Sequence, residues 1–224
     1  NNFVKNKFPI IIILIISLNT FNTKAQNEKG KWKTFKQLSR PEKCWVITHI
    51  FVANKAFNVS NYVRKVADSL KNDSVLDGDA DGGQVDAFRH SYWMAVLVRE
   101  IHSKKALKLG IAHEKGNYLD FKKRKKEDGT LPDKIACEMD LWNNNVGINL
   151  GEKYKNISLD SLKTIVISEI LKGNMKVVFK NKSGESLDEQ GNIIPYKEWN
   201  GKWENRRVLV NSDYNRSKKV NNEY

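Results

Sequence analysis

The sequence has little cysteine, with two residues in 224, and it contains no internal repeat and no low-complexity tract. Cys44 and Cys137 both lie in apolar segments that are typical of helices. In an exported protein they can form one disulfide, and two buried free thiols are the alternative. No cysteine lies just after the apolar N-terminal segment, which argues against a lipoprotein anchor. No recognised nucleic-acid-binding motif is present, so we expect no specific nucleic-acid site.

The N-terminal segment has the pattern of a secretory signal peptide. Lys5 and Lys7 make its start basic, an apolar stretch follows over residues 8–18, and small side chains lie near residue 25. This stretch is too short to span a bilayer, so it predicts export rather than a transmembrane anchor. We expect cleavage after Ala25 and a mature protein that is periplasmic or extracellular.

The chain is strongly basic, with 39 Lys and Arg residues, 26 Asp and Glu residues and a net charge of +13. Removal of residues 1–25 takes away three lysines and no acid, which brings the net charge from +13 to +10. A charge of this sign favours an anionic substrate, phospholipid head groups or an envelope polymer as partner. The densest basic run, Lys122–Lys126, is also typical of a solvated helix end, so charge alone does not identify the partner.

Apolar residues recur at helical spacing over most of the chain, which predicts a mainly α-helical protein. Ser39 and Glu42 form a capping box at the start of a helix that carries Trp45, Ile47 and Phe51. Further helices are expected from Ser60 to Leu70, over 84–102 and 104–123, from Pro132 to about Asn145 before Gly147, and over 158–171.

From residue 175 the pattern changes to short β-type runs at 177–179, 191–195 and 207–210, with a turn at 182–184. Trp199 and Trp203 are expected to pin this segment to the helices. The sequence therefore predicts a signal peptide over 1–25, a multi-helix domain over 26–174 and a small β-containing tail over 175–224.

Three short polar motifs fall on successive predicted helices. They read Asp86-Ala-Phe-Arg-His90, Ala112-His113-Glu114 and Glu138-Met-Asp140-Leu-Trp-Asn143-Asn144. Asp86 and His90 are four residues apart, as are Asp140 and Asn144, so each pair projects from one face of its helix. Because an unpaired buried polar group costs roughly 1–3 kcal/mol, these faces are expected to satisfy one another or to share a ligand.

The residue types in these motifs allow three interpretations. Imidazole and carboxylate groups on adjacent helices are typical of a metal site, with His90, His113, Asp140 and Asp86 as ligands of zinc or manganese. Without a metal, a carboxylate can orient a histidine as general base, with Glu114 as the acid. The third interpretation is a purely structural polar core.

Two further motif residues have a structural and a functional interpretation. Arg89 either holds a carboxylate of a neighbouring helix or clamps a phosphate or carboxylate of a substrate. Asn144 is either part of a helix terminus or a ligand or substrate contact one turn after Asp140.

The segment Asp77-Gly-Asp79-Ala-Asp81-Gly82 matches the first half of a calcium-binding EF-hand loop. The twelfth position is Phe88 rather than the glutamate that closes such a site. Calcium at Asp77–Asp81 and a flexible acidic loop are both compatible with this pattern.

The motifs Asp86-Ala-Phe-Arg-His-Ser-Tyr-Trp93, Ala112-His-Glu114 and Met139-Asp-Leu-Trp-Asn-Asn144 resemble those of an uncharacterised bacterial family of secreted proteins. Modules of this family also occur at the C-termini of polymorphic toxins. The resemblance covers roughly residues 75–155 and identifies as motif residues Asp86, Arg89, His90, His113, Glu114, Asp140, Asn143 and Asn144. It implies no particular activity.

Two more distant resemblances concern the reaction class. The order His90, His113-Glu114, Asp140 is similar to that of helical metal phosphohydrolases, with Glu in place of Asp and a shorter spacing. Arg89-His90-Ser-Tyr92 is similar to a motif of phospholipase A2, with Ser91 in place of the acid.

The favoured hypothesis is an exported metal-assisted hydrolase of phosphoester or phospholipid-type substrates. In this hypothesis His90, His113 and Asp140 hold the metal, while Glu114 transfers the proton. Arg89 or Asn144 stabilises the developing anion. The rival hypothesis is a non-enzymatic exported protein, with a binding or structural role, whose polar cluster fixes helix packing.

Overall fold

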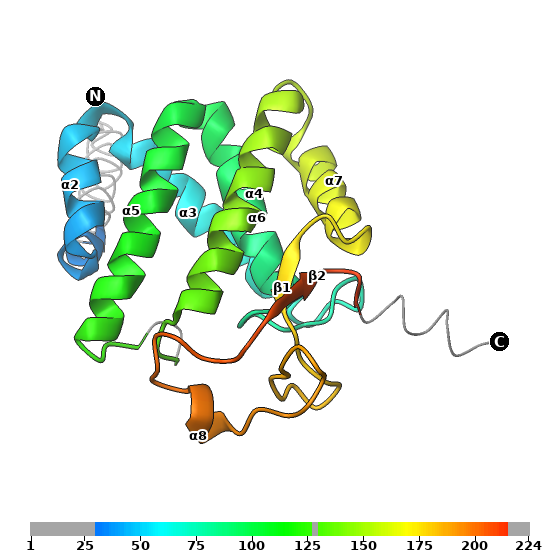
Figure 1. Cartoon of the computed structure of the whole chain (residues 1–224). Coiled ribbons are helices and arrows are strands. Elements are labelled where there is room, and N and C mark those ends of the chain that lie inside the picture. The colour runs from blue at the N-terminus through cyan, green and yellow to red at the C-terminus, as the bar shows by residue number, and fades with distance from the viewer. Residues whose placement is uncertain (1–29, 127–129, 215–224) are drawn as a thin grey trace, which may run out of the picture. The chain divides into compact units, whose positions relative to one another are not determined.

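The structure is a computed structural model that describes residues 30–126 and 130–214 (Figure 1). The predicted signal peptide over 1–25 lies outside these residues. The chain divides into two units, residues 1–38 and 39–224. In the first unit residues 30–37 are helical, and Trp32 stacks on Phe35. None of the helices in the described part of the chain has the length and apolar character needed to cross a membrane.

The second unit is mainly helical and carries a small two-stranded antiparallel sheet near its C-terminal end, as the sequence predicts. Its elements in chain order are α2 (Arg40–Thr48), α3 (Ile50–Leu70), α4 (Gln84–Ile101), α5 (Ser103–Lys122), α6 (Lys134–Lys153), α7 (Leu159–Leu171), β1 (Lys176–Val178), α8 (Tyr196–Trp199) and β2 (Leu209–Asn211).

The capping box at Ser39 is confirmed, but the helix that follows it is shorter than the sequence predicts. Glu42 returns a hydrogen bond to the backbone of Ser39, and α2 ends at Thr48. After a break at His49, α3 runs through Ser60 without interruption. The prediction of a helix start at Ser60 was wrong because its hydroxyl donates to the carbonyl of Ala56 inside α3, where it also accepts from Trp93.

Helix α4 is the centre of the second unit and packs against α3, α5, α6 and α7. Its side chains are buried on almost every face, among them Phe88, Tyr92 and Leu97. A helix enclosed in this way has few positions for polar side chains in contact with water. The polar residues of α4 therefore need partners on neighbouring helices.

Two glycines of α6 allow its backbone to approach α4 closely. A Cβ atom on Gly147 would lie 2.1 Å from the carbonyl oxygen of Ser91, and one on Gly151 would lie 2.6 Å from that of Ala95. The sequence predicts that this helix ends near Gly147. This prediction was wrong, because α6 continues to Lys153. The glycine serves packing against α4 rather than helix termination.

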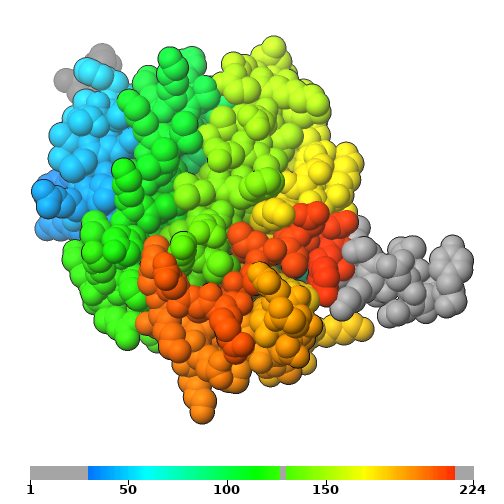
Figure 2. Space-filling model, viewed as in Figure 1, coloured from blue at the N-terminus to red at the C-terminus, as the bar shows by residue number. Residues whose placement is uncertain are grey.

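The C-terminal tail is attached to the helices by side-chain contacts (Figure 2). Asn143 of α6 accepts from the backbone N–H of Lys176 and donates to its carbonyl, both at 2.9 Å, which fixes β1 against α6. Trp203 packs on Tyr118 and Phe121 of α5, as predicted. Residues 191–195 form no regular strand; an isolated bridge joins Ile193 to Leu187 before α8 begins.

Both cysteines are free thiols, Cys44 exposed on α2 and Cys137 buried on α6. Of the two alternatives, a disulfide or two buried free thiols, the structure agrees with free thiols, but only Cys137 is buried. Burial, together with the charges of Glu114 and Asp140, raises the pKa of the Cys137 thiol far above its usual range. A protonated buried thiol is neither a metal ligand nor a nucleophile.

Candidate functional site

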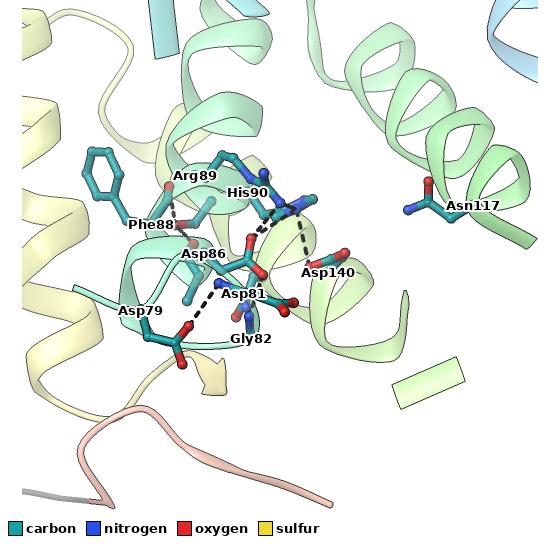
Figure 3. A network of polar contacts seen from close by, with 12 residues as sticks. Asp79, Asp81, Gly82, Asp86, Phe88, Arg89, His90, Asn117 and Asp140 are labelled. Atoms are coloured by element: carbon teal, nitrogen blue, oxygen red, sulfur yellow. Dashed lines mark hydrogen bonds and ion pairs between the residues drawn. The ribbon is translucent and has the colours of Figure 1, made fainter. Parts of the chain in front are cut away.

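Asp86 and His90 of α4 meet Asp140 of α6 in the interior (Figure 3). Nε2 of His90 lies 3.3 Å from Oδ1 of Asp140 and 3.6 Å from Oδ1 of Asp86. All three side chains are buried, each less than a tenth exposed. Within residues 30–126 and 130–214 this is the one group of three such side chains whose ligand atoms all lie within 4.8 Å of one another. We call it the Asp–His–Asp cluster.

The start of α4 positions Asp86. Gly83 precedes the helix, and Asp86 lies in its first turn, where the unpaired N–H groups favour an anion. Its Oδ2 accepts from the backbone N–H of Gly82 at 2.8 Å, and its Oδ1 accepts from Arg89 at 2.7 Å. Oδ1 of Asp86 thus faces both the guanidinium and His90.

Burial shifts the acid–base properties of the cluster. It raises the pKa of Asp86 to about 6, although Arg89 and the Gly82 N–H oppose the shift. It also holds the pKa of His90 well below its usual range, with further contributions from the charges of Arg89 and His113, while Asn144 opposes this effect. His90 is therefore a neutral imidazole near pH 7, which is the form that binds metals.

The spacing of the donor atoms fits a small transition-metal ion. Zinc binds imidazole nitrogen and carboxylate oxygen at roughly 2.0–2.2 Å in a tetrahedral arrangement, so neighbouring donors lie about 3.3–3.6 Å apart. The two distances from Nε2 of His90 to the carboxylate oxygens, 3.3 and 3.6 Å, fall in this range. Three protein ligands leave one tetrahedral position for water or substrate.

Arg89 supplies the positive charge next to the cluster. Its Nη2 lies 2.7 Å from Oδ1 of Asp86 and 3.3 Å from Nε2 of His90. The side chain is 27 % exposed, more than any of the three cluster residues, and it lines a pocket together with Asp86 and Asp140. A cation bound to the same atoms would have to displace this guanidinium.

Asn144 lies on the other side of His90. Both atoms of its amide group are buried, and in the described part of the chain neither they nor Nδ1 of His90 make a hydrogen bond of normal geometry. Asn144 nevertheless favours the charged form of His90. A metal-bound imidazole commonly donates its second N–H to an oxygen acceptor, and the amide of Asn144 offers one within the core.

The structure does not place His113 among the three ligand atoms of the cluster. Its ring centroid lies 6.2 Å from that of His90, and its Nδ1 is 3.0 Å from Oε1 of Glu42. Sequence reasoning interpreted Glu42 as a helix cap and missed this contact. The capping box itself offered a hint, because Glu42 uses one carboxylate oxygen for the backbone N–H of Ser39 and its other oxygen stays available for a second partner.

Glu114 is buried on α5 and accepts from Nδ2 of Asn117 at 3.1 Å. Its charge and its hydrogen bond with Cys137 contribute to the raised pKa of that thiol. Glu114 is not part of the pocket lining, but Asn117 is. The amide of Asn117 therefore connects Glu114 to the pocket by a hydrogen bond, but an amide does not carry protons.

The acidic loop before α4 uses its carboxylates internally. Asp77 accepts from the backbone N–H groups of Asp79 and Gln84, and Asp79 accepts from that of Asp81. The Lys180 ammonium lies 2.7 Å from Oδ2 of Asp79 and also contacts the carbonyl of Asp81. The Lys180 ammonium thus partly neutralises the acidic loop, as the Arg89 guanidinium does at the Asp–His–Asp cluster.

A pocket of about 580 Å³ opens above the cluster. Asp86, Arg89 and Asp140 form part of its wall, and Trp199 and Arg207 of the tail form another part. Arg207 forms a buried ion pair with Asp133 and stacks over Trp199, so the tail completes a fixed wall. The cluster is therefore reachable from the pocket through the two carboxylates and Arg89.

Fold and site together define a helical domain that holds a buried Asp–His–Asp cluster beneath a polar pocket. The family model "Domain of unknown function (DUF6973)" matches residues 43–176, which is more than half of the 224 residues. The chain therefore belongs to this family. This confirms the expectation of an uncharacterised domain family. Neither a curated protein nor a solved structure matches the chain.

Proposed function

We propose that this protein is a metal-dependent hydrolase in which Asp86, His90 and Asp140 bind one divalent transition metal, zinc or manganese. The observation that carries the proposal is the convergence of the three ligand atoms within 4.8 Å in a buried cluster that borders a pocket. The donor set of one imidazole and two carboxylates suits both metals. A metal held by these three residues would supply an activated water for attack on a substrate in the pocket.

We propose an anionic substrate such as a phosphoester or a phospholipid head group because of the position of Arg89, and not because of the overall charge of the pocket wall, which carries five aspartates and four basic side chains. Arg89 stands beside the cluster, and Arg64 of α3 and Lys71, directly after α3, also line the pocket. A guanidinium displaced from Asp86 is placed to stabilise negative charge on a phosphoryl group. Glu114 and Asn144, which do not line the pocket, are proposed to act from behind it. Glu114 orients the amide of Asn117 at the pocket wall, and Asn144 orients the ring of His90.

His113 is proposed to act as the proton acceptor for the attacking water rather than as a metal ligand. It lies beside His90 on the neighbouring helix, and its ring is held by Glu42. Because His113 does not line the pocket, the proton of the attacking water is proposed to reach it through an intervening water molecule. General-base assistance of this kind contributes roughly 10²–10⁴-fold to a rate.

The test uses metal-stripped protein reloaded with zinc or manganese and assayed on p-nitrophenyl phosphate, bis-p-nitrophenyl phosphate and phospholipid vesicles. We expect hydrolysis to return with metal in the wild type and to fall at least about 100-fold in His90→Gln, which keeps most of the side-chain volume. Circular dichroism of both proteins checks that the fold is retained.

Three results contradict the proposal in different ways. Hydrolysis by metal-free protein indicates metal-free catalysis by the same residues, which the contact of Arg89 with Asp86 and His90 favours as the alternative. Metal binding without hydrolysis of any of the three substrates indicates a binding protein. Neither metal binding nor hydrolysis indicates a structural polar cluster.

We also propose that the protein is exported by bacteria and loses residues 1–25. The support is the basic start, the apolar stretch over 8–18 and Ala25, together with the resemblance of the three motifs to secreted and toxin-associated modules. Expression of the full chain in a bacterial host should yield a periplasmic or extracellular protein whose N-terminus, read by mass spectrometry, is Gln26. Uncleaved protein confined to the cytoplasm would exclude export.

A further inference from the structure

A second carboxylate–imidazole pair lies next to the Asp–His–Asp cluster. Nδ1 of His113 on α5 is 3.0 Å from Oε1 of Glu42 on α2. The two side chains are 23 % and 16 % exposed, so the pair lies at the edge of the interior rather than in solvent. Its imidazole faces inward, because the His113 ring lies 6.2 Å from that of His90 and 5.7 Å from that of Trp93.

The start of α2 holds Glu42 in place. Its Oε2 accepts from the backbone N–H of Ser39 at 2.8 Å, which leaves Oε1 for His113. Gly116 lies three residues after His113, and a Cβ there would come within 2.4 Å of the Ser39 hydroxyl. The missing side chain at Gly116 lets the start of α2 approach α5 closely enough for the carboxylate to reach the ring.

Glu42 is a carboxylate in its ionised form. Burial raises its pKa, but the hydrogen bond and charge of His113 and the hydrogen bonds of Ser39 outweigh burial and hold the pKa below its usual range. An ionised carboxylate only accepts hydrogen bonds, so Nδ1 of His113 has to carry the hydrogen. In the neutral ring the lone pair is then on Nε2.

We propose that Glu42 is a positioning residue that fixes the tautomer and the orientation of His113, so that Nε2 accepts the proton at the Asp–His–Asp cluster. This inference rests on the proposed hydrolase function. Glu42 stands one residue before the segment matched by the family model, residues 43–176, and it belongs to none of the three sequence motifs.

Glu42→Gln tests the inference because the amide has a single oxygen. The N–H of Ser39 requires an acceptor, so the amide oxygen turns toward Ser39 and the NH₂ group faces Nδ1 of His113. The hydrogen on the ring must then move to Nε2. The ¹⁵N chemical shifts of His113 report this change in metal-free protein above the histidine titration range, and His113→Gln identifies the resonances.

Ser39→Ala is the matched control. It removes the hydroxyl, which accepts from the Glu42 N–H and also interacts with the Glu42 carboxylate, and it weakens the same helix cap. It keeps the backbone N–H that holds Oε2. We expect Ser39→Ala to lower the melting temperature and to leave the His113 tautomer and the turnover number unchanged. Glu42→Gln should invert the tautomer and lower kcat by about 10–100-fold, with KM unchanged.

The outcomes separate this inference from the function on which it rests. An unchanged tautomer in Glu42→Gln, an equal change in Ser39→Ala, or an inverted tautomer with unchanged kcat each overturns the role of Glu42. Absence of hydrolysis in the wild type overturns the proposed function instead, and the ¹⁵N shifts still decide whether Glu42 sets the tautomer of His113.

Discussion

Replacement of Gly147 by alanine is expected to destabilise the protein by about 3 kcal/mol or more. The new methyl group would lie 2.1 Å from the carbonyl oxygen of Ser91, and about 0.9 Å of movement is needed to reach the 3.0 Å of the closest real contacts. The obstacle is the backbone of α4, which has no rotamer with which to yield. Thermal unfolding should show a decrease in Tm of about 6–12 °C.

Gly110→Ala is the matched control, because Gly110 is also a helical glycine in the interior. Its methyl group would meet Cε of Met94 at 2.9 Å, and a flexible methionine end can move aside. Alanine is more favourable than glycine in a helix by about 1 kcal/mol, so the net change should be within about 1 kcal/mol. Equal losses in the two variants would show that α6 does not depend on the close approach at Gly147.

Asp140→Asn is expected to weaken zinc and manganese binding by at least about 100-fold. Asparagine keeps the volume of the side chain but removes the charge of one of three ligands, and changes outside the ligand shell already cost roughly 10–100-fold. Isothermal titration of metal-stripped protein measures the loss. Saturating metal should raise the unfolding free energy of the wild type by about 2.7 kcal/mol at 100 times Kd and that of the variant much less.

Asp81→Asn controls for the charge of the acidic pocket wall. Asp81 lines the same pocket, but it lies in the loop before α4 and is not part of the Asp–His–Asp cluster. We expect the Asp81→Asn variant to bind zinc and manganese with the affinity of the wild type. Equal weakening in the two variants would indicate a diffuse acidic surface, and unchanged affinity in Asp140→Asn would remove Asp140 from the ligand set.

Much of the helical architecture could be predicted from the sequence because its signals are local. The capping box at Ser39 and the change of pattern after residue 175 were interpreted correctly. Gly147 was misinterpreted because a glycine that ends a helix and one that lets two helices touch look alike in a sequence. Its role depends on Ser91, which is 56 residues earlier in the chain and close only in the folded protein.

The candidate site was predicted only in part, because the sequence reveals local spacing but not contacts between distant residues. Spacing of four residues showed that Asp86 and His90 share a helix face, and the structure places Asp140, which the sequence also predicted as a ligand, next to this pair. The sequence did not show that His113 pairs with Glu42, since the two residues are 71 positions apart. Nor did it show that Lys180 of the tail contacts Asp79, because no local pattern encodes a contact across 101 positions.

The location of a bound metal tests the central claim most directly. Crystals of the full chain soaked in zinc, with diffraction recorded on both sides of the zinc absorption edge, locate the ion by anomalous scattering. We expect one strong peak within bonding distance of Asp86, His90 and Asp140, with Arg89 displaced toward the pocket. A zinc peak only elsewhere, such as at Asp77–Asp81, or no peak in saturating zinc, would contradict the account.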